Sequence, residues 1–168
     1  MTHIKRVLFL DFDGVLHYSG NELPFSRTSF LEKIIELDPH LDIIISSSWR
    51  ESFDLQGLKD FFPDSIAERI QGVTPIFKAS LLQNEDGDWV EQNQGIRQKE
   101  IEQYMVDNYP LNTSWIALDD AADLFKEDTN LILTPTGMNE ETVDAFEYWL
   151  KATLGIPVLP LPMINLKK

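Results

Sequence analysis

The 168-residue sequence contains no cysteine, which excludes disulfide frameworks, thiolate metal sites and cysteine nucleophiles. It also lacks an apolar run of membrane-spanning length, so we expect no membrane partner. Basic residues are scarce: 14 Lys and Arg stand against 28 Asp and Glu, for a formal net charge of −14. Because Lys and Arg supply much of the affinity for nucleic-acid phosphates, this balance argues against stable binding of a duplex.

The length of the chain indicates how many domains to expect, and its two end segments carry further expectations. A protein of 168 residues and 19.3 kDa is typical of a single domain, here residues 1–168, with a substantial core. The first apolar strand starts within ten residues of the beginning, so we expect no signal peptide and a cytoplasmic location. The apolar, proline-rich tail at 156–168 is expected to be irregular and to pack on its own domain, in a monomer or weak dimer.

Two aspartates, Asp11 and Asp13, follow the apolar run 7–10 with one residue between them. Four consecutive apolar residues are typical of a strand buried on both faces. Unpaired buried charge is costly, so carboxylates at the end of such a strand indicate that a cation meets them there. The alternative is an ordinary turn, since Asp and Gly are common after strands and Gly14 follows directly.

Polar side chains also follow two other apolar runs. Asp119 and Asp120 follow the run 115–118, and Ser46, Ser47 and Ser48 follow the run 41–45. Ligands of open α/β sheets bind at the carboxyl ends of the strands. Acid, hydroxyl and acid at three strand ends therefore predict one site for magnesium and phosphate.

Apolar stretches alternate between strand and helix patterns, which favours a parallel sheet covered on both faces. The expected fold class is α/β, a three-layer, doubly wound (Rossmann-like), mostly parallel sheet. We expect strands at 6–11, 41–46, 70–73, 115–118 and 130–133, and helices at 28–37, at 55–62 ended by Pro63, around 101–105 and after an N-cap at Asn139. The polar stretch 74–95 is expected to form a loop or small hairpin near the site, too short for a separate cap domain.

With these motifs the sequence resembles the phosphohydrolases of the haloacid dehalogenase (HAD) superfamily, as a core without a large cap. The first motif is matched by Val7 to Gly14, the second by Ser46 or Ser47, and the fourth by Asp119 and Asp120. The third, a Lys or Arg before a helix, is matched by Arg97 or Lys99. More narrowly, the stretches 47–50, 97–101 and 115–120 are similar to small HAD domains of bacterial RNA-repair proteins.

The resemblance implies an Mg²⁺-dependent phosphatase that works through an aspartyl-phosphate. Asp11 would be the nucleophile and Asp13 the general acid and base. The implied Mg²⁺ ligands are Asp11, the backbone carbonyl of Asp13, Asp119 and Asp120. The phosphoryl group would be bound by Ser47, favoured over Ser46, and by Arg97, favoured over Lys99. Arg50 would contact the substrate. Trp49 could stack on a base, but packing in the core is the expectation, and His17 is expected to be a loop residue and not a proton shuttle.

The substrate and two alternative functions stay open. A small phosphorylated compound or a nucleic-acid end fits the implied chemistry. A receiver domain of a signalling system also forms an aspartyl-phosphate, but its acidic pair should follow the first strand and its phosphorylated Asp should lie near mid-chain. A catalytically silent binding domain is the third possibility, although both acids of the first motif are present.

Overall fold

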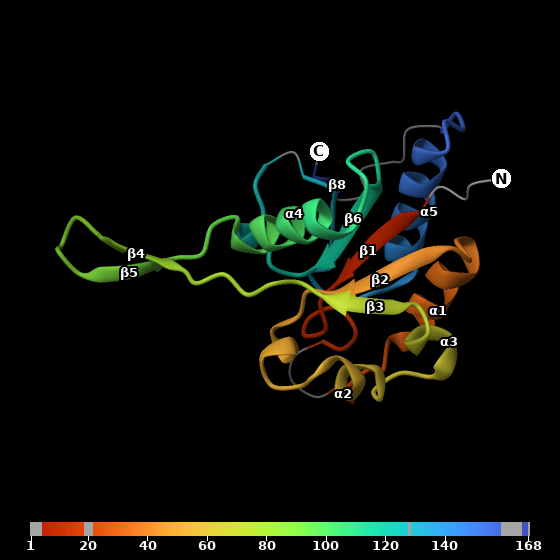
Figure 1. The fold of residues 1–168 in the computed structure, drawn as a ribbon, viewed down its shortest axis with the longest axis horizontal. Helices are drawn as coiled ribbons and strands as arrows, with labels where there is room; N and C mark the ends of the chain where they lie inside the picture. The colour runs from red at the N-terminus through yellow and green to blue at the C-terminus, as the bar shows by residue number, and fades with distance from the viewer. Residues whose placement is uncertain (1–4, 19–21, 128, 159–165, 168) are drawn as a thin grey trace.

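A six-stranded sheet with the strand order β3-β2-β1-β6-β7-β8 forms the centre of the structure (Figure 1). The computed structural model describes residues 5–18, 22–127, 129–158 and 166–167. The strands of this sheet are β1 (Arg6–Leu10), β2 (Leu41–Ile45), β3 (Ile70–Val73), β6 (Ser114–Asp119), β7 (Leu131–Leu133) and β8 (Leu166–Lys167). Neighbouring strands are parallel except for β8, which runs antiparallel to β7. The expected α/β fold class is confirmed.

The register of the three central strands places their carboxyl ends level with one another. Leu10 at the end of β1 pairs with Ile45 of β2 on one side and with Leu118 of β6 on the other. Every residue of β1 and β2 is buried. The residues that follow these ends therefore share one edge of the sheet, at the point between β1 and β6 where the strand order reverses.

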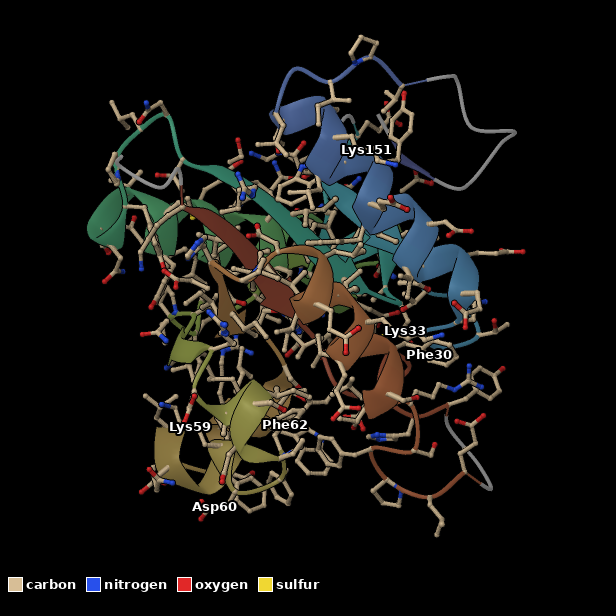
Figure 2. All side chains as sticks on the ribbon, turned by 90° about the vertical axis from the view of Figure 1, so that its right-hand side faces the viewer. Phe30, Lys33, Lys59, Asp60, Phe62 and Lys151 are labelled. Atoms are coloured by element: carbon tan, nitrogen blue, oxygen red, sulfur yellow. The ribbon has the colours of Figure 1, made fainter. Side chains whose placement is uncertain are left out.

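Helices cover both faces of the sheet in three layers (Figure 1). On one face pack α1 (Thr28–Leu37), α5 (Glu140–Thr153) and the short helices α2 (Leu55–Lys59) and α3 (Asp64–Ala67). The other face is covered by α4 (Ile96–Asn108) and the 3-10 turn η2 (Ala122–Leu124). A second 3-10 turn, η1 (Ser48–Glu51), follows β2. Figure 2 shows Phe62 nearer the centre of the molecule than the neighbouring Lys59 and Asp60.

Most helix boundaries agree with the expected ones, and the region around Pro63 differs. Asn139 is the expected N-cap of α5: it forms a capping box in which its side chain accepts from the Thr142 N–H. The single helix expected over 55–62 is shorter, and α3 begins directly after Pro63. The extended backbone of Pro63 (φ −62°, ψ 156°) starts this second helix instead of only ending the first.

The stretch 74–95 forms a two-stranded antiparallel hairpin of β4 (Ser80–Gln83) and β5 (Trp89–Gln92). The turn contains Gly87 in the left-handed region, at φ +86°. Every residue of both strands is exposed, and the hairpin projects away from the sheet (Figure 1). Within 74–95, only the segments before β4 and after β5 come close to the predicted site.

The tail, expected to be irregular over 156–168, contributes β8 at its end. Residues 156–158 have no regular structure, and 159–165 and 168 lie outside the described residues. Within the described part of the chain, none of the helices combines the length and the hydropathy needed to cross a bilayer.

Candidate active site

Three carboxylates meet at the carboxyl edge of the sheet. Asp11 follows β1, Asp119 ends β6, and Asp120 follows it. One oxygen of each lies within 4.8 Å of the others, an arrangement that could hold a metal ion. The Asp11 N–H donates to Leu118 O at 3.0 Å, which locks the two strand ends together. More than a hundred residues separate the two acidic motifs, and the parallel register alone brings them together.

The electrostatics of this cluster favour an added cation. Burial raises the pKa of Asp11, and the Arg97 guanidinium opposes that shift. Burial and the Asp11 carboxylate raise the pKa of Asp119 to about 7. Asp119 Oδ1 accepts from the Ala121 N–H at 2.9 Å, whereas Oδ2 is buried without a hydrogen-bond partner among the described residues. Ionised carboxylates packed this closely repel one another and need a positive charge between them.

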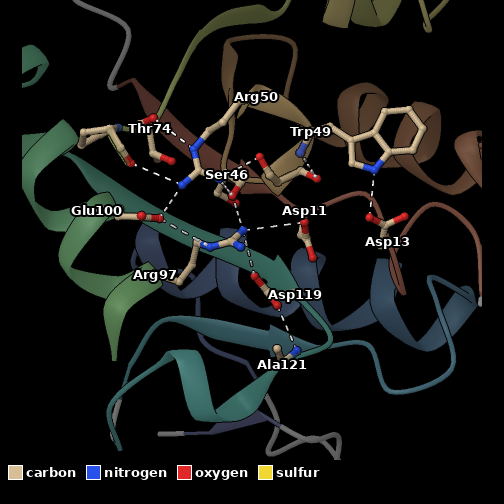
Figure 3. A network of polar contacts seen from close by, with 12 residues as sticks. Asp11, Asp13, Ser46, Trp49, Arg50, Thr74, Arg97, Glu100, Asp119 and Ala121 are labelled. Atoms are coloured by element: carbon tan, nitrogen blue, oxygen red, sulfur yellow. Dashed lines mark hydrogen bonds and ion pairs between the residues drawn. The ribbon is translucent and has the colours of Figure 1, made fainter. Parts of the chain in front are cut away.

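Arg97 is the basic side chain that faces the carboxylates from the start of α4 (Figure 3). Its Nη1 lies 3.7 Å from Asp11 Oδ1 and 3.5 Å from Asp119 Oδ2, and donates to Ser46 O. Lys99, the other candidate for the third motif, is exposed. The structure therefore places Arg97, and not Lys99, at the site.

Gly14 allows Asp120 to reach the cluster. Its φ of +73° lies in the left-handed region, and a Cβ built there would come within 2.0 Å of Asp120 Oδ2. The Gly14 N–H donates to His17 O at 2.9 Å, which closes the turn after β1. The glycine of the first motif is thus required both by the turn and by the acidic side chain packed against it.

The two candidate hydroxyls occupy different environments. Hydrogen bonding from the Ser47 side chain lowers the pKa of Asp11, against the larger effect of burial, so this hydroxyl lies at the Asp11 carboxylate. Ser47 Oγ also accepts from the Trp49 N–H at 3.4 Å as the N-cap of η1. Ser46 Oγ is buried without a hydrogen-bond partner in the described residues. The geometry favours Ser47 as the hydroxyl of the second motif.

Arg50 is a framework residue of the site, contrary to the expected contact with substrate. Its side chain is only 3% exposed. All five of its N–H groups are used within the protein: Nε donates to Thr74 O, Nη1 to Ser46 O and Ser47 O, and Nη2 to Pro75 O and Glu100 Oε2. Figure 3 shows these contacts of Arg50, above the carboxylates in that view. With every donor occupied, Arg50 has none left for a ligand.

Glu100, which the sequence analysis did not single out, is the anchor of this framework. Its buried carboxylate accepts from Arg50 Nη2 at 2.7 Å and from the Phe77 N–H at 2.9 Å, and lies 3.7 Å from Arg97 Nε. It therefore links three segments: the turn after β2, which carries Arg50; the stretch before the hairpin, which carries Phe77; and α4, to which Glu100 itself belongs. Its position three residues after Arg97, on the same helix face, is the sequence signal that could have identified it.

We predict that replacement of Arg50 by methionine lowers the free energy of unfolding by about 3–5 kcal/mol, because Glu100 stays buried without its closer charged partner and keeps only the 3.7 Å contact with Arg97 Nε. The double variant Arg50→Met, Glu100→Gln should lose less, since the charge of Glu100 is removed together with that of Arg50. Chemical denaturation measures both. Lys33→Met, which breaks the exposed pair with Glu140, should change stability by less than about 1 kcal/mol. A loss no larger for Arg50→Met than for Lys33→Met would contradict the framework role.

Asp13 stands outside the carboxylate cluster and is held by two donors. Its side chain is 60% exposed. Trp49 Nε1 donates to Oδ2 at 2.8 Å, and His17 Nε2 lies 2.9 Å from Oδ1. Because the Phe25 N–H donates to His17 Nδ1, the ring proton of a neutral His17 is on Nε2 and points at Asp13. His17 and Trp49 therefore position Asp13, a role that the sequence analysis did not assign to either.

The family to which the chain belongs follows from a match over most of its length. Residues 7–143 match the family described as the HAD domain in Swiss Army Knife RNA repair proteins. The chain belongs to this family. No curated protein and no solved structure gave a significant match.

The matched region of the HAD domain includes every residue of the carboxylate cluster, its hydroxyl and its arginine, and also the projecting hairpin. Membership supports a phosphohydrolase of the HAD type in general, and HAD proteins typically depend on a metal. The acidic cluster of Asp11, Asp119 and Asp120 agrees with that dependence.

Proposed function

We propose that this HAD domain is an Mg²⁺-dependent phosphatase that hydrolyses phosphate monoesters through an aspartyl-phosphate on Asp11. The observation that carries the proposal is the convergence of Asp11, Asp119 and Asp120, from the ends of two neighbouring strands, beside Arg97. An all-oxygen ligand set of carboxylates suits Mg²⁺. The first and fourth HAD motifs thus supply one site.

The three carboxylates fit a bound Mg²⁺. The buried Oδ2 of Asp119, which has no hydrogen-bond partner among the described residues, offers a free ligand atom. Asp11 and Asp120 supply the other carboxylate oxygens, and the resemblance adds the backbone carbonyl of Asp13. When bound, the ion offsets the repulsion between these acids and a phosphate dianion and orients one phosphate oxygen.

Asp11 and Asp13 carry the bond changes. A carboxylate oxygen of Asp11 attacks phosphorus, and the bond from phosphorus to the ester oxygen breaks while Asp13 gives its proton to the departing alkoxide. Asp13 then takes a proton from water, whose oxygen attacks phosphorus and breaks the bond to Asp11. Alcohol and inorganic phosphate leave, and both aspartates return to their starting states.

The remaining residues hold these groups and the phosphoryl in place. The Ser47 hydroxyl donates to a phosphoryl oxygen, and Arg97 offsets the charge that develops in the transition state. His17 and Trp49 fix the orientation of Asp13, while each of its oxygens keeps a lone pair for the proton in transit. A group that must first give and then take a proton gains from such fixed placement.

The substrate we propose is a small phosphate ester or the terminal phosphate of a nucleic acid, as the name of the family suggests. A net charge of −14 argues against stable binding of a duplex. We further propose that the domain acts as a monomer or weak dimer. The receiver alternative is disfavoured because the paired acids at Asp119 follow a late strand instead of the first.

A magnesium-dependence assay with intermediate trapping tests this proposal. We expect hydrolysis of an aryl phosphate with saturating Mg²⁺ and no turnover with EDTA. Acid quenching followed by mass spectrometry should find one added phosphoryl group on Asp11. A phosphorylated Asp11 without turnover would favour the receiver-like switch. Neither label nor turnover with Mg²⁺ on any phosphate ester tried would favour a silent binding domain.

A further inference from the structure

Three aromatic rings form a connected surface beside Asp13, here called the aromatic shelf: Trp49, Phe53 and Phe61. The Trp49 and Phe53 rings are stacked at 5.8 Å between centroids and 24° between planes. Phe61 lies edge-on to both, at 5.2 Å from each. Phe53 is 43% exposed and Phe61 37% exposed. One face of Phe61 is covered by Phe25, stacked on it at 5.1 Å and 8° between planes, and one face of Phe53 by Trp49, so the shelf presents to solvent the parts of the rings that these partners leave uncovered.

The shelf lies on top of a core that is already closed. Phe12 and Phe62 beneath it are buried and pack edge-to-face at 5.5 Å. Burial of Phe53 and Phe61 is thus not needed to fill that core. Aromatic surface left exposed to water costs free energy, and a contiguous exposed apolar patch often marks a ligand-binding surface.

Contact with the proton donor ties the shelf to the reaction. Trp49 Nε1 donates to Asp13 Oδ2 at 2.8 Å, so the indole edge lies directly against the residue that protonates the leaving group. The ester oxygen must come within hydrogen-bond reach of Asp13. Whatever is attached to that oxygen therefore lies next to Trp49, the ring on which Phe53 stacks and against which Phe61 packs edge-on.

We propose that the aromatic shelf stacks the base of a nucleoside, so that the preferred substrates are nucleoside phosphates, either free or at the end of a strand. This inference rests on the proposed phosphatase function and names its substrate class. In an aryl ester such as phosphotyrosine the ring is bonded to the ester oxygen and would lie at Asp13 itself. Phe53 and Phe61 instead contact Trp49, whose indole N–H contacts Asp13, so a ring that stacks on them is better separated from the phosphate by a linking group such as a sugar.

The charge of the protein agrees with recognition by stacking. At −14 the chain repels a polyanion, and both Arg50 and Arg97 are buried and contact groups of the protein. Stacking of a base on an aromatic side chain contributes about 1–3 kcal/mol, is tolerant of base identity and does not depend on phosphate contacts. We expect a preference for nucleosides that persists as salt is raised, with little choice among bases.

The test compares adenosine 5′-monophosphate with ribose 5-phosphate, with the 3′-phosphate of adenosine as a second ester. Phe53→Ala and Phe61→Ala should each raise the KM for the nucleotides roughly tenfold with little change in kcat, the equivalent of about 1.4 kcal/mol. Hydrolysis of ribose 5-phosphate should stay the same. Phe53→Tyr should restore the wild-type KM, and Phe53→Leu, which is apolar without a π face, should restore it only in part.

Controls separate the shelf from general effects and the two sources of nucleotide from each other. Trp89→Ala removes a 67% exposed aromatic ring on the distant hairpin and should change nothing. An oligonucleotide with the same terminal nucleotide gives a higher kcat/KM than the mononucleotide if strand ends are preferred, and an equal or lower value if free nucleotides are. Equal efficiency toward adenosine and ribose phosphates in the wild type, or equal losses on both in Phe53→Ala, would overturn the proposal.

A binding measurement distinguishes failure of the shelf from failure of the phosphatase. Adenosine, titrated against the wild type by quenching of tryptophan fluorescence or by calorimetry, reports stacking without turnover. Binding that weakens in Phe53→Ala supports the shelf even if no ester is hydrolysed. Wild-type binding that is undetectable, or that is unchanged in Phe53→Ala, rules the shelf out even if aryl phosphates are hydrolysed.

Discussion

Replacement of Asp11 by asparagine should lower kcat for phosphate-ester hydrolysis by roughly 10⁴-fold or more, the scale of loss that follows removal of an enzyme nucleophile. The amide has nearly the shape of the carboxylate, so the fold should be kept, but it cannot form the acyl phosphate. It also removes the charge of one proposed metal ligand and of one of the two carboxylates that face Arg97 Nη1. Steady-state kinetics with saturating Mg²⁺ measures the loss, and mass spectrometry should find no phosphoryl group on the variant.

Asp42→Asn is the matched control for this prediction. Asp42 is as buried as Asp11, but it lies at the opposite end of the sheet, where it accepts from Tyr109 Oη and Lys5 Nζ. The same loss of charge there should leave kcat within a few-fold of wild type. Wild-type turnover in Asp11→Asn, with a purified protein free of deamidated material, would remove Asp11 from the role of nucleophile.

The positions of the central strands along the chain were predictable because short apolar runs that end in polar residues give a strong local signal. The residues 70–73 form the expected strand, and α1 has the expected bounds of 28–37. Level strand ends, which bring Asp11 and Asp119 together, follow from parallel pairing and could be inferred from topology. The choices between Ser46 and Ser47 and between Arg97 and Lys99 could not, since they depend on side-chain direction at the end of a strand and on one helix.

Residue roles that depend on burial and on contacts between distant segments could not be predicted from the sequence. Arg50 follows a strand-end loop, where an arginine can equally bind a ligand or the protein. Only the carbonyl groups gathered around it and the buried Glu100 decide between these roles. The contacts of His17 and Trp49 with Asp13 likewise depend on how the loop after β1 folds onto η1. Spacing alone carries little information about such contacts.

Replacement of Asp119 by asparagine should raise the stability of the metal-free protein while abolishing its response to Mg²⁺. Removal of one charge relieves the burial cost and the repulsion from Asp11 that together raise the pKa of Asp119 to about 7, for a gain on the order of 1 kcal/mol at pH values above that pKa. Asn Oδ1 can still accept from the Ala121 N–H. In the wild type, Mg²⁺ at a hundred times its Kd should add about 2.7 kcal/mol and raise Tm by roughly 5–10 °C. The variant should show little of this rise and little turnover.

The pH dependence separates this explanation from a general effect of charge. Because the folded-state pKa of Asp119 is raised from 3.8 to about 7, its protonated form stabilises the fold below the unfolded-state pKa, and that contribution is lost as pH rises through 7. The metal-free wild type should therefore approach the stability of Asp119→Asn as pH falls from 8 toward about 5. Asp144→Asn, the same charge change on the exposed side of α5, should keep the Mg²⁺ response and show no such convergence. If Asp119→Asn is less stable than wild type at pH 8 without metal, Asp119 stabilises the fold by contacts other than those to a cation. If the Mg²⁺ response of Asp119→Asn is undiminished, the metal binds elsewhere.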